Sequence, residues 1–274
     1  MDQKKTSEGV KKNQSLRKAL QILEGMTRIK TPARLQDIAQ SLRMPQSTLL
    51  RFLNTYIDYG YVGQDPNSSC YYLTLKLADM GSRASSSFSI QDYLGKYVKQ
   101  AAAAFNESAS LCVEQDMQMV YIVTEEGPGH MLRTLHRIGH IAPMHATGVG
   151  KLHLLNYSED QLAELQEKRG FSKFTEHTIT TREALKKELA LIQKSGYAMD
   201  DEECENGVRC IAVPVWNFQN RVVAGISVSV PVARLDKKKA AEITRFLKEI
   251  GVNASREMGW EGAEPRTGKS LKGD

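Results

Sequence analysis

Residues 35–53 read LQDIAQSLRMPQSTLLRFL and contain two short apolar repeats of helical spacing, with only Arg43 and Met44 between them. The first repeat comprises Leu35, Ile38, Ala39 and Leu42. The second follows Pro45, a residue suited to the first turn of a helix, and comprises Leu49, Leu50, Leu53 and Ile57. Gly60 is expected to end it. Two short helices joined by so tight a turn are typical of a helix-turn-helix, whose second helix enters the DNA major groove.

The flanking segments complete a small domain. Apolar residues between 16 and 26 predict an amphipathic helix capped by Ser15, and Thr31–Pro32 is expected to open the next helix. After Gly60, the stretch YVGQDPNSSCYYLTL predicts two short strands joined at 65–69, which would form a wing. The order helix, helix, tight turn, helix, hairpin favours DNA binding over a plain helical core with a polar surface.

The residues predicted to contact DNA lie on the outer face of the second repeat. They offer hydrogen-bonding groups for base edges and a guanidinium for a guanine or a phosphate. These residues are Gln46, Ser47, Thr48 and Arg51, together with Arg34 before the first repeat.

The charge is unevenly distributed. Residues 1–83 hold 13 Lys and Arg against 7 Asp and Glu, whereas residues 84–274 hold 24 against 25. A basic N-terminal third next to a nearly neutral remainder is expected when one domain binds a polyanion and the other does not. The alternative is a basic surface that contacts only solvent. The 274 residues, 41% of them hydrophobic, allow two globular domains. No apolar leader or membrane-span pattern occurs in the sequence, which predicts a soluble cytoplasmic protein without membrane contact.

Residues 144–152 read MHATGVGKL and resemble a phosphate-binding loop. Such a loop needs a glycine where His145 stands and a hydroxyl where Leu152 stands, so a nucleotide site is not expected. Residues 146–150 are expected to form a turn into a helix, with free N–H groups that favour a carboxylate ligand.

The rest of the chain predicts a mixed α and β domain. Helices are expected at 90–105, 150–155, within 158–169, at 181–196 and at 238–258. Strands are expected at 109–115 and 118–126 around a turn at Asp116 and Met117, and at 131–138, 210–217 and 222–230.

Enzymatic and metal chemistry find little support in the sequence. Five of the six histidines lie between 130 and 153, but their spacing fits no familiar metal site, and no G-x-S-x-G or Cys/His motif occurs. The four scattered cysteines predict neither a disulfide framework nor a zinc ribbon. We therefore expect no catalytic residue, metal or cofactor.

From residue 15 to 258 the sequence resembles the IclR family of bacterial transcriptional regulators. The matching motifs are SLRKALQIL, LQDIAQSLRMPQSTLLRFL, YGYV, APMHATGVGK, FTEHTIT, GYAMDDEE, GVRCIAVPV and ISVSVP. The resemblance implies a two-domain α+β protein that is not an enzyme. A winged helix-turn-helix at 15–73 and a linker helix at 74–93 would precede a GAF/profilin-like α/β domain with a curved antiparallel sheet at 94–258. Flexible tails are expected at 1–14 and 259–274.

The resemblance also assigns an effector pocket, whose residues correspond to Met131, Thr134, Gly148, Val149, Asp200, Cys210, Ser227 and Ser229. It implies a dimer, or a tetramer of two dimers, that binds palindromic double-stranded DNA and responds to a small organic acid. Three features depart from the family pattern: a wing tip without a basic residue, Gln46 in place of a basic residue, and Cys204, to which no role is assigned. The alternatives from other classes are a small-molecule enzyme or storage protein, and a signalling module that binds protein partners.

Overall fold

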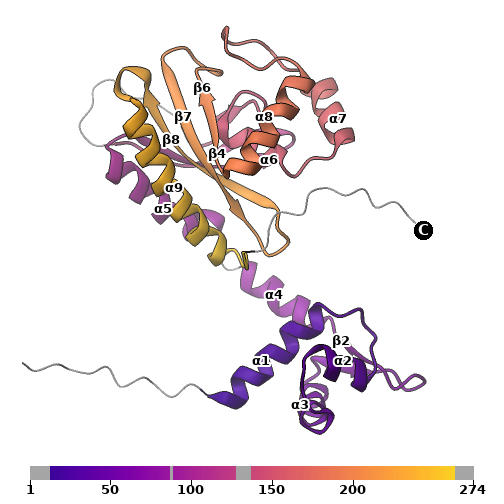
Figure 1. Ribbon diagram of the computed structural model, residues 1–274. Helices are drawn as coiled ribbons and strands as arrows, with labels where there is room; N and C mark the ends of the chain where they lie inside the picture. Colours follow the sequence, from indigo (N-terminus) through magenta and orange to yellow (C-terminus); the bar gives the residue numbers. More distant parts are fainter. Residues whose placement is uncertain (1–12, 87–88, 128–136, 263–274) are drawn as a thin grey trace, which may run out of the picture. The chain divides into compact units, whose positions relative to one another are not determined.

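The computed structural model describes residues 13–86, 89–127 and 137–262, and the chain divides into two compact units, residues 1–88 and 89–274 (Figure 1). Met131 and Thr134 lie outside the described residues, as do most of both predicted tails. Within the described parts of the chain, no helix has the length and apolar character that a membrane crossing requires. The predicted limits of the linker and of the effector domain remain predictions.

The first unit is a winged helix-turn-helix, as the sequence predicts. Its elements are α1 (Gln14–Thr27), α2 (Leu35–Ser41), α3 (Gln46–Asp58), β1 (Val62–Gln64), β2 (Tyr71–Leu73) and α4 (Lys76–Ser86). Strands β1 and β2 pair antiparallel around the turn at 65–69. The fully buried core side chains are Ile22, Met26, Ile38, Leu49, Leu53 and Val62. The predicted helix, tight turn, helix and hairpin are therefore confirmed.

Three details of the predicted helix starts are wrong. Asn13, not Ser15, caps α1, because its side chain accepts the N–H of Leu16. Helix α2 begins only at Leu35, because Ala33 pairs with the backbone of Tyr71 in the wing. Pro45 stands just before α3 instead of in its first turn. In the last two cases a contact or backbone angle decided the boundary, which helical spacing alone cannot reveal.

The inner face of α3 also differs from the prediction. Leu50 is 36% exposed, whereas Tyr56 is buried and its hydroxyl donates a hydrogen bond to the Ala19 carbonyl of α1. The buried positions Leu49, Leu53 and Tyr56 follow i, i+4, i+7 spacing, and Leu50 is turned about 100° away from Leu49.

The second unit is built on one antiparallel sheet of six strands in the order β5-β4-β3-β8-β7-β6. The strands are β3 (Ser108–Gln115), β4 (Gln118–Glu125), β5 (Ile141–Ala142), β6 (Ala198–Asp201), β7 (Val208–Trp216) and β8 (Val222–Pro231). The helices are α5 (Ile90–Phe105), α6 (Gly148–Leu154), α7 (Glu159–Arg169), α8 (Arg182–Ser195) and α9 (Lys237–Glu257), with a 3₁₀ turn η1 (Val232–Arg234). The predicted curved antiparallel sheet is confirmed.

Helices cover both faces of this sheet (Figure 1). Helices α5 and α9 lie side by side on one face, over a core that includes Leu111, Val213 and Ile226. Helix α6 packs on the other face, over Cys112 and Ala212, and α7 and α8 complete that layer. Because neighbouring residues of a strand point to opposite faces, the polar residues at 108, 110, 210, 227 and 229 all belong to the α6 side.

Several predicted elements of this unit needed correction. The sequence missed β6 and β5, which have four and two residues. The predicted strand at 131–138 falls mostly outside the described residues, and Arg137 and Ile138 are not in a strand. Helix α6 starts at Gly148, so Gly148 and Val149 belong to the helix rather than to a turn before it. Strands this short carry too few alternations to be recognised by pattern.

Candidate nucleic-acid interface and ligand site

The predicted recognition face is presented by the start of α3. Gln46, Ser47 and Arg51 are exposed, and Thr48 is half-buried. The Arg51 guanidinium lies 5.7 Å from the centre of the Phe52 ring, and no described carboxylate pairs with it. Arg34 is exposed just before α2. These side chains are therefore free to contact a ligand outside the unit.

Sequence reasoning missed Leu50, which it placed in the core. Leu50 lies three residues after Ser47 and four after Gln46, so it belongs to the same exposed helix face. An exposed leucine among polar groups on a groove-reading helix can contact a thymine methyl group. Spacing alone could not reveal this, because Leu50 lies three residues before Leu53 and seven before Ile57, as residues on one helix face do.

The wing tip is stabilised internally by an acidic residue. The Asp65 carboxylate accepts hydrogen bonds from the N–H groups of Asn67 and Ser68 and from the Ser68 hydroxyl. These bonds lower the pKa of Asp65 below its usual value. No basic residue occurs at 65–69, so this tip offers a phosphate no cation.

The predicted effector residues of the sheet lie in two cross-strand rows on the α6 side. In the first row, Asp200 of β6 pairs with Cys210 of β7, which pairs with Ser229 of β8. In the second row, Ala212 of β7 pairs with Ser227 of β8. The structure therefore brings Asp200, Cys210, Ser227 and Ser229 together, as the resemblance implies.

Asp200 carries the carboxyl group of this set, and it is buried. Its Oδ1 accepts the N–H of Glu203 at 2.8 Å and the N–H of Cys204 at 3.2 Å. Burial nevertheless raises the pKa of Asp200 to about 7, since desolvation outweighs these hydrogen bonds. The backbone of Cys204, which the sequence left without a role, thus helps to hold the Asp200 side chain.

The two thiols near Asp200 are protonated and act as weak hydrogen-bonding groups. Burial raises the pKa of the Cys210 thiol well above its usual value, and that of Cys204 to about 12. The Cys210 Sγ lies 3.1 Å from the Ser229 Oγ. These cysteines add polarity to the row but no negative charge.

Helix α6 lies directly against the rows. A side chain at Gly148 would place its Cβ 3.2 Å from the Ala212 Cβ, and one at Gly150 would place it 2.4 Å from the Met144 backbone. Only glycine permits the approach at residue 150, whereas a side chain at residue 148 requires a shift of a few tenths of an ångström between α6 and Ala212. The expectation that the N–H groups of residues 146–150 are free is wrong for Gly150, because Thr147 caps the helix and its hydroxyl accepts the Gly150 N–H.

Lys151 of the same helix is completely buried, and it is paired within the protein. Its Nζ donates to Glu203 and lies 3.5 Å from Glu188 Oε1. The other carboxylate oxygen of Glu203 has no hydrogen-bond partner among the described residues. Burial, as the largest influence, raises the pKa of Glu203. A lysine held in this way cannot reach a phosphate. This agrees with the prediction that residues 144–152 do not form a nucleotide site.

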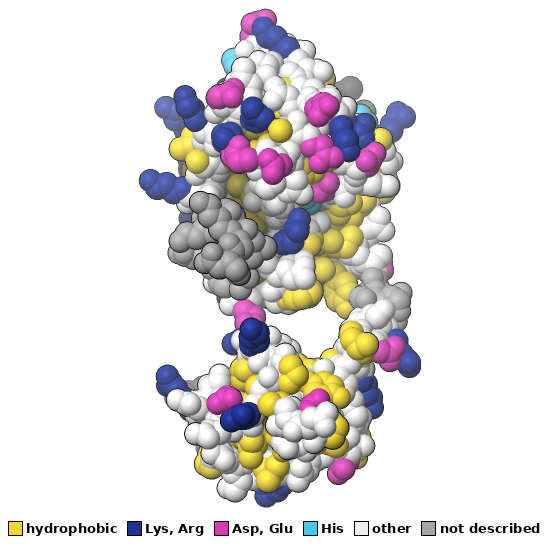
Figure 2. All heavy atoms as spheres, turned by 90° about the vertical axis from the view of Figure 1, so that its right-hand side faces the viewer, with side chains coloured by type: hydrophobic (Ala, Val, Ile, Leu, Met, Phe, Trp, Pro, Cys, Tyr) yellow, Lys and Arg dark blue, Asp and Glu magenta, His cyan; other side chains and the backbone are white. Residues whose placement is uncertain are grey.

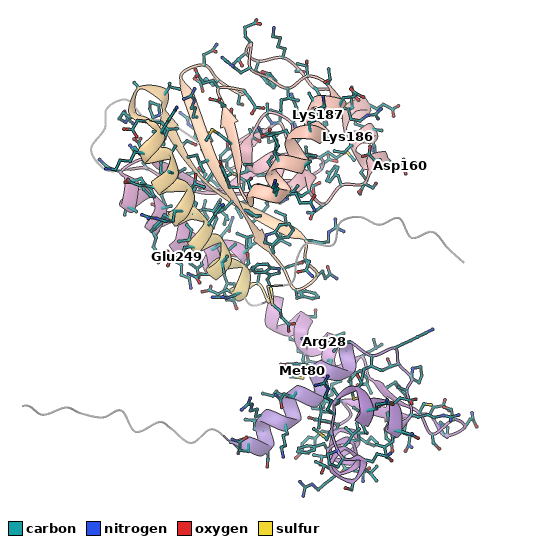
Figure 3. The ribbon with its side chains drawn as sticks, in the orientation of Figure 1. Arg28, Met80, Asp160, Lys186, Lys187 and Glu249 are labelled. Carbon is teal, nitrogen blue, oxygen red and sulfur yellow. The ribbon has the colours of Figure 1, made fainter. Side chains whose placement is uncertain are left out.

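A cavity of about 1090 Å³ lies elsewhere in the second unit. It is lined by residues of α6, α7, α8 and α9, by the end of β7 and by the loop at 219–221, among them Trp216 and Leu189, and by Trp260 after α9. Asp160 of α7 and Lys186 of α8 lie at its rim (Figure 3), and hydrophobic side chains gather in a hollow on this side of the molecule (Figure 2). None of the predicted effector residues lines it.

Two of the described histidines, His145 and His153, are buried in structural surroundings. His145 stacks on the rings of Phe171 and Phe174, with centroids 5.1 and 5.8 Å away. His153 is buried, which lowers its pKa to about 4 and keeps it neutral at physiological pH. Within residues 13–86, 89–127 and 137–262, no group of three or more His, Cys, Asp or Glu side chains is placed to hold a metal ion.

Comparisons with known proteins agree with this architecture. The model of the IclR helix-turn-helix domain matches residues 15–66, and that of the C-terminal domain of bacterial transcriptional regulator IclR matches residues 82–256. The HTH-type transcriptional regulator XynR of Escherichia coli is 34% identical over 247 residues, which cover 90% of this chain and 98% of XynR.

Two further relatives extend the match. KdgR of Escherichia coli, another HTH-type transcriptional regulator, is 33% identical over 224 residues, covering 82% of this chain and 85% of KdgR. The crystal structure of Thermotoga maritima IclR aligns with a TM-score of 0.59 and 28% identity over 90% of this chain and 99% of that one. The chain therefore belongs to the IclR family of bacterial transcriptional regulators, with a helix-turn-helix domain that binds DNA and a C-terminal effector-binding domain, and it is not an enzyme.

Proposed function

We propose that this regulator binds a palindromic operator as a dimer or a pair of dimers, and that a small organic acid bound in the second unit changes its affinity for DNA. The observation that supports a ligand switch best is the group of buried polar side chains formed by Asp200, Ser227 and Ser229, beside the half-buried Cys210. Polar side chains are unusual in the interior of a sheet otherwise packed with apolar residues, because burial removes their contacts with water. An acid that prefers one conformation of the protein would shift its DNA affinity, whereas equal affinity for both would not.

DNA contact is assigned to the exposed face of α3. Gln46, Ser47, Thr48 and Arg51 would contact base edges or phosphates, and Leu50 would contact a thymine methyl group. Arg34 would contact the DNA backbone. Gel retardation with the DNA upstream of the protein's own gene is the first test, because an enzyme or a storage protein would leave that DNA unshifted.

Arg51→Ala should weaken operator binding by about 1–3 kcal/mol if the guanidinium contacts a base. If it contacts only a phosphate, the slope of log affinity against log salt concentration should instead become shallower by about one, the contribution of one phosphate contact. Fluorescence anisotropy across a salt series distinguishes the two results. Arg256→Ala, which removes an exposed arginine from α9, is the matched control and should change neither quantity. An unchanged affinity and salt slope for Arg51→Ala would remove α3 from the interface.

We assign the dimer interface to α4 and to Leu75, the residue before it. Leu75 is 85% exposed and Met80, labelled in Figure 3, is 48% exposed, and none of the described side chains of α4 is buried within the first unit. An amphipathic helix with its apolar face uncovered favours pairing with a second copy. A single helix-turn-helix reads one half-site, so a dimer also suits a palindrome.

Sedimentation at micromolar concentration should show at least a dimer. The double variant Leu75→Glu/Met80→Glu should shift the protein toward monomer, because two charges would have to be buried in the interface. Leu191→Glu, at another exposed leucine on α8, is the control and should leave the assembly unchanged. A wild-type protein that is monomeric both free and on DNA would contradict the dimer.

Replacing Ser227 and Ser229 together with alanine removes two hydroxyl donors without adding bulk. We expect the affinity for an acid effector to fall at least about tenfold, since each lost hydrogen bond costs about 1 kcal/mol and more when its partner is charged. Operator binding without ligand should be unchanged, because both serines are in the second unit. Calorimetry with the acid and anisotropy with the operator test the two parts separately. Retained ligand affinity would place the pocket elsewhere.

A further inference from the structure

One buried hydroxyl beside the predicted effector residues is unexplained by the fold. Ser110 of β3 is 1% exposed, and its Oγ has no hydrogen-bond partner among the described residues. A hydroxyl taken out of water without a partner destabilises the folded state, and native proteins contain few such groups. An unpartnered hydroxyl therefore points to a role beyond packing.

The register places Ser110 beside the effector rows. Ser110 pairs with Ser227 of β8, which pairs with Ala212 of β7, so the second row continues from Ala212 through Ser227 to Ser110. Ser110 and Cys112 share one face of β3, and Cys112 belongs to the core beneath α6. Cβ atoms of directly opposite residues on neighbouring antiparallel strands are about 4.5–5.5 Å apart. A small molecule bonded to Ser227 is thus within reach of the Ser110 hydroxyl.

Two other polar side chains of this region are already engaged. Asp200 accepts two backbone N–H groups, and Ser229 lies within hydrogen-bonding distance of Cys210. Ser110 differs because its donor and its acceptor capacity are both unused within the described structure. It can therefore either donate to or accept from a ligand oxygen.

We propose that Ser110 is a further ligand-binding residue, which recognises a second oxygen of the effector acid. The carboxylate would engage Ser227 and Ser229, and a hydroxyl or carbonyl oxygen on the adjacent carbon would bond to Ser110. The site would then select hydroxy or oxo acids over the same acids without that oxygen, since the latter leave the buried hydroxyl unpaired. This inference rests on the effector site proposed above.

The test uses the full chain and matched pairs of acids as probes. Calorimetry compares 2-hydroxybutanoate with butanoate and 2-hydroxypropanoate with propanoate, on wild type and on Ser110→Ala. Wild type should prefer each hydroxy acid by about tenfold, the equivalent of one hydrogen bond. Ser110→Ala should bind the hydroxy acids about tenfold more weakly and the plain acids as before. Equal losses for both members of a pair would overturn the inference while leaving the acid site intact.

A stability measurement separates ligand recognition from a structural role. Without ligand, Ser110→Ala should melt at the same temperature as wild type or higher, because it removes a buried hydroxyl that has no partner. The control is Ser255→Ala, whose hydroxyl donates to the Gly251 carbonyl at 2.6 Å and accepts the Trp216 N–H at 2.9 Å, and which should melt lower. A comparable fall for Ser110→Ala would overturn the inference. A wild-type protein that binds none of these acids would overturn the proposed acid effector, and this inference with it.

Discussion

Lys151→Met is expected to destabilise the second unit by about 3–5 kcal/mol, because it leaves a buried carboxylate without its counter-ion. Lys151 is completely buried, and its ammonium is held by Glu203 and Glu188. Methionine fills much of the same volume, so the decrease in the free energy of unfolding would come from the unpaired charge of Glu203 rather than from a cavity. Equilibrium denaturation of wild type and variant measures the difference.

The double variant Lys151→Met/Glu203→Gln is the informative control. Neutralising both partners should recover much of the lost stability, since a buried ion pair and a neutral pair are often of similar stability. Because burial already raises the pKa of Glu203, the cost of Lys151→Met should shrink as the pH falls and this carboxyl takes up a proton. A loss below about 1 kcal/mol, with no coupling between the two positions, would show that the pair is not essential to the fold.

Asp200→Asn should have a higher free energy of unfolding than wild type, and this difference should be about 2–3 kcal/mol larger at pH 8 than at pH 5. The pKa of Asp200 is about 7 in the folded protein and 3.8 as its ordinary value, so between these values the folded state keeps a proton that the unfolded chain releases. Its contribution to stability is therefore complete below about pH 3.8 and is lost as the pH rises through about 7. Asparagine cannot ionise, and its Oδ1 keeps the acceptor for the N–H groups of Glu203 and Cys204.

Denaturation curves at several pH values test this expectation, with Glu203→Gln as the comparison. Glu203 and Lys151 are the charged groups that influence Asp200 most, and the thiols of Cys204 and Cys210 stay protonated over this range. If Glu203→Gln, and not Asp200→Asn, removes the pH dependence, the titration belongs to Glu203. Under the proposed function, acid affinity of the wild type should also fall above pH 7, because ionised Asp200 would repel a carboxylate.

The DNA-binding unit could be predicted from the sequence almost completely, because its elements are local. Helical spacing, Pro45, Gly60 and the turn at 65–69 lie within a few residues of the structure that they determine. The exceptions depended on contacts between distant residues. The pairing of Ala33 with Tyr71 delays α2, and the bond from Tyr56 to Ala19 helps to set which side of α3 is buried.

In the second unit, the sequence by itself determined the long helices, the long strands and, through family motifs, the residues proposed for the effector site. It could not determine what surrounds them. Ser110 pairs with Ser227, 117 positions along the chain, and Lys151 pairs with Glu203, 52 positions along. The burial of Asp200 depends on the helix packed above it. Strand register and desolvation arise only when the sheet and α6 come together, and they decide which polar groups are satisfied, which are charged and which are left for a ligand.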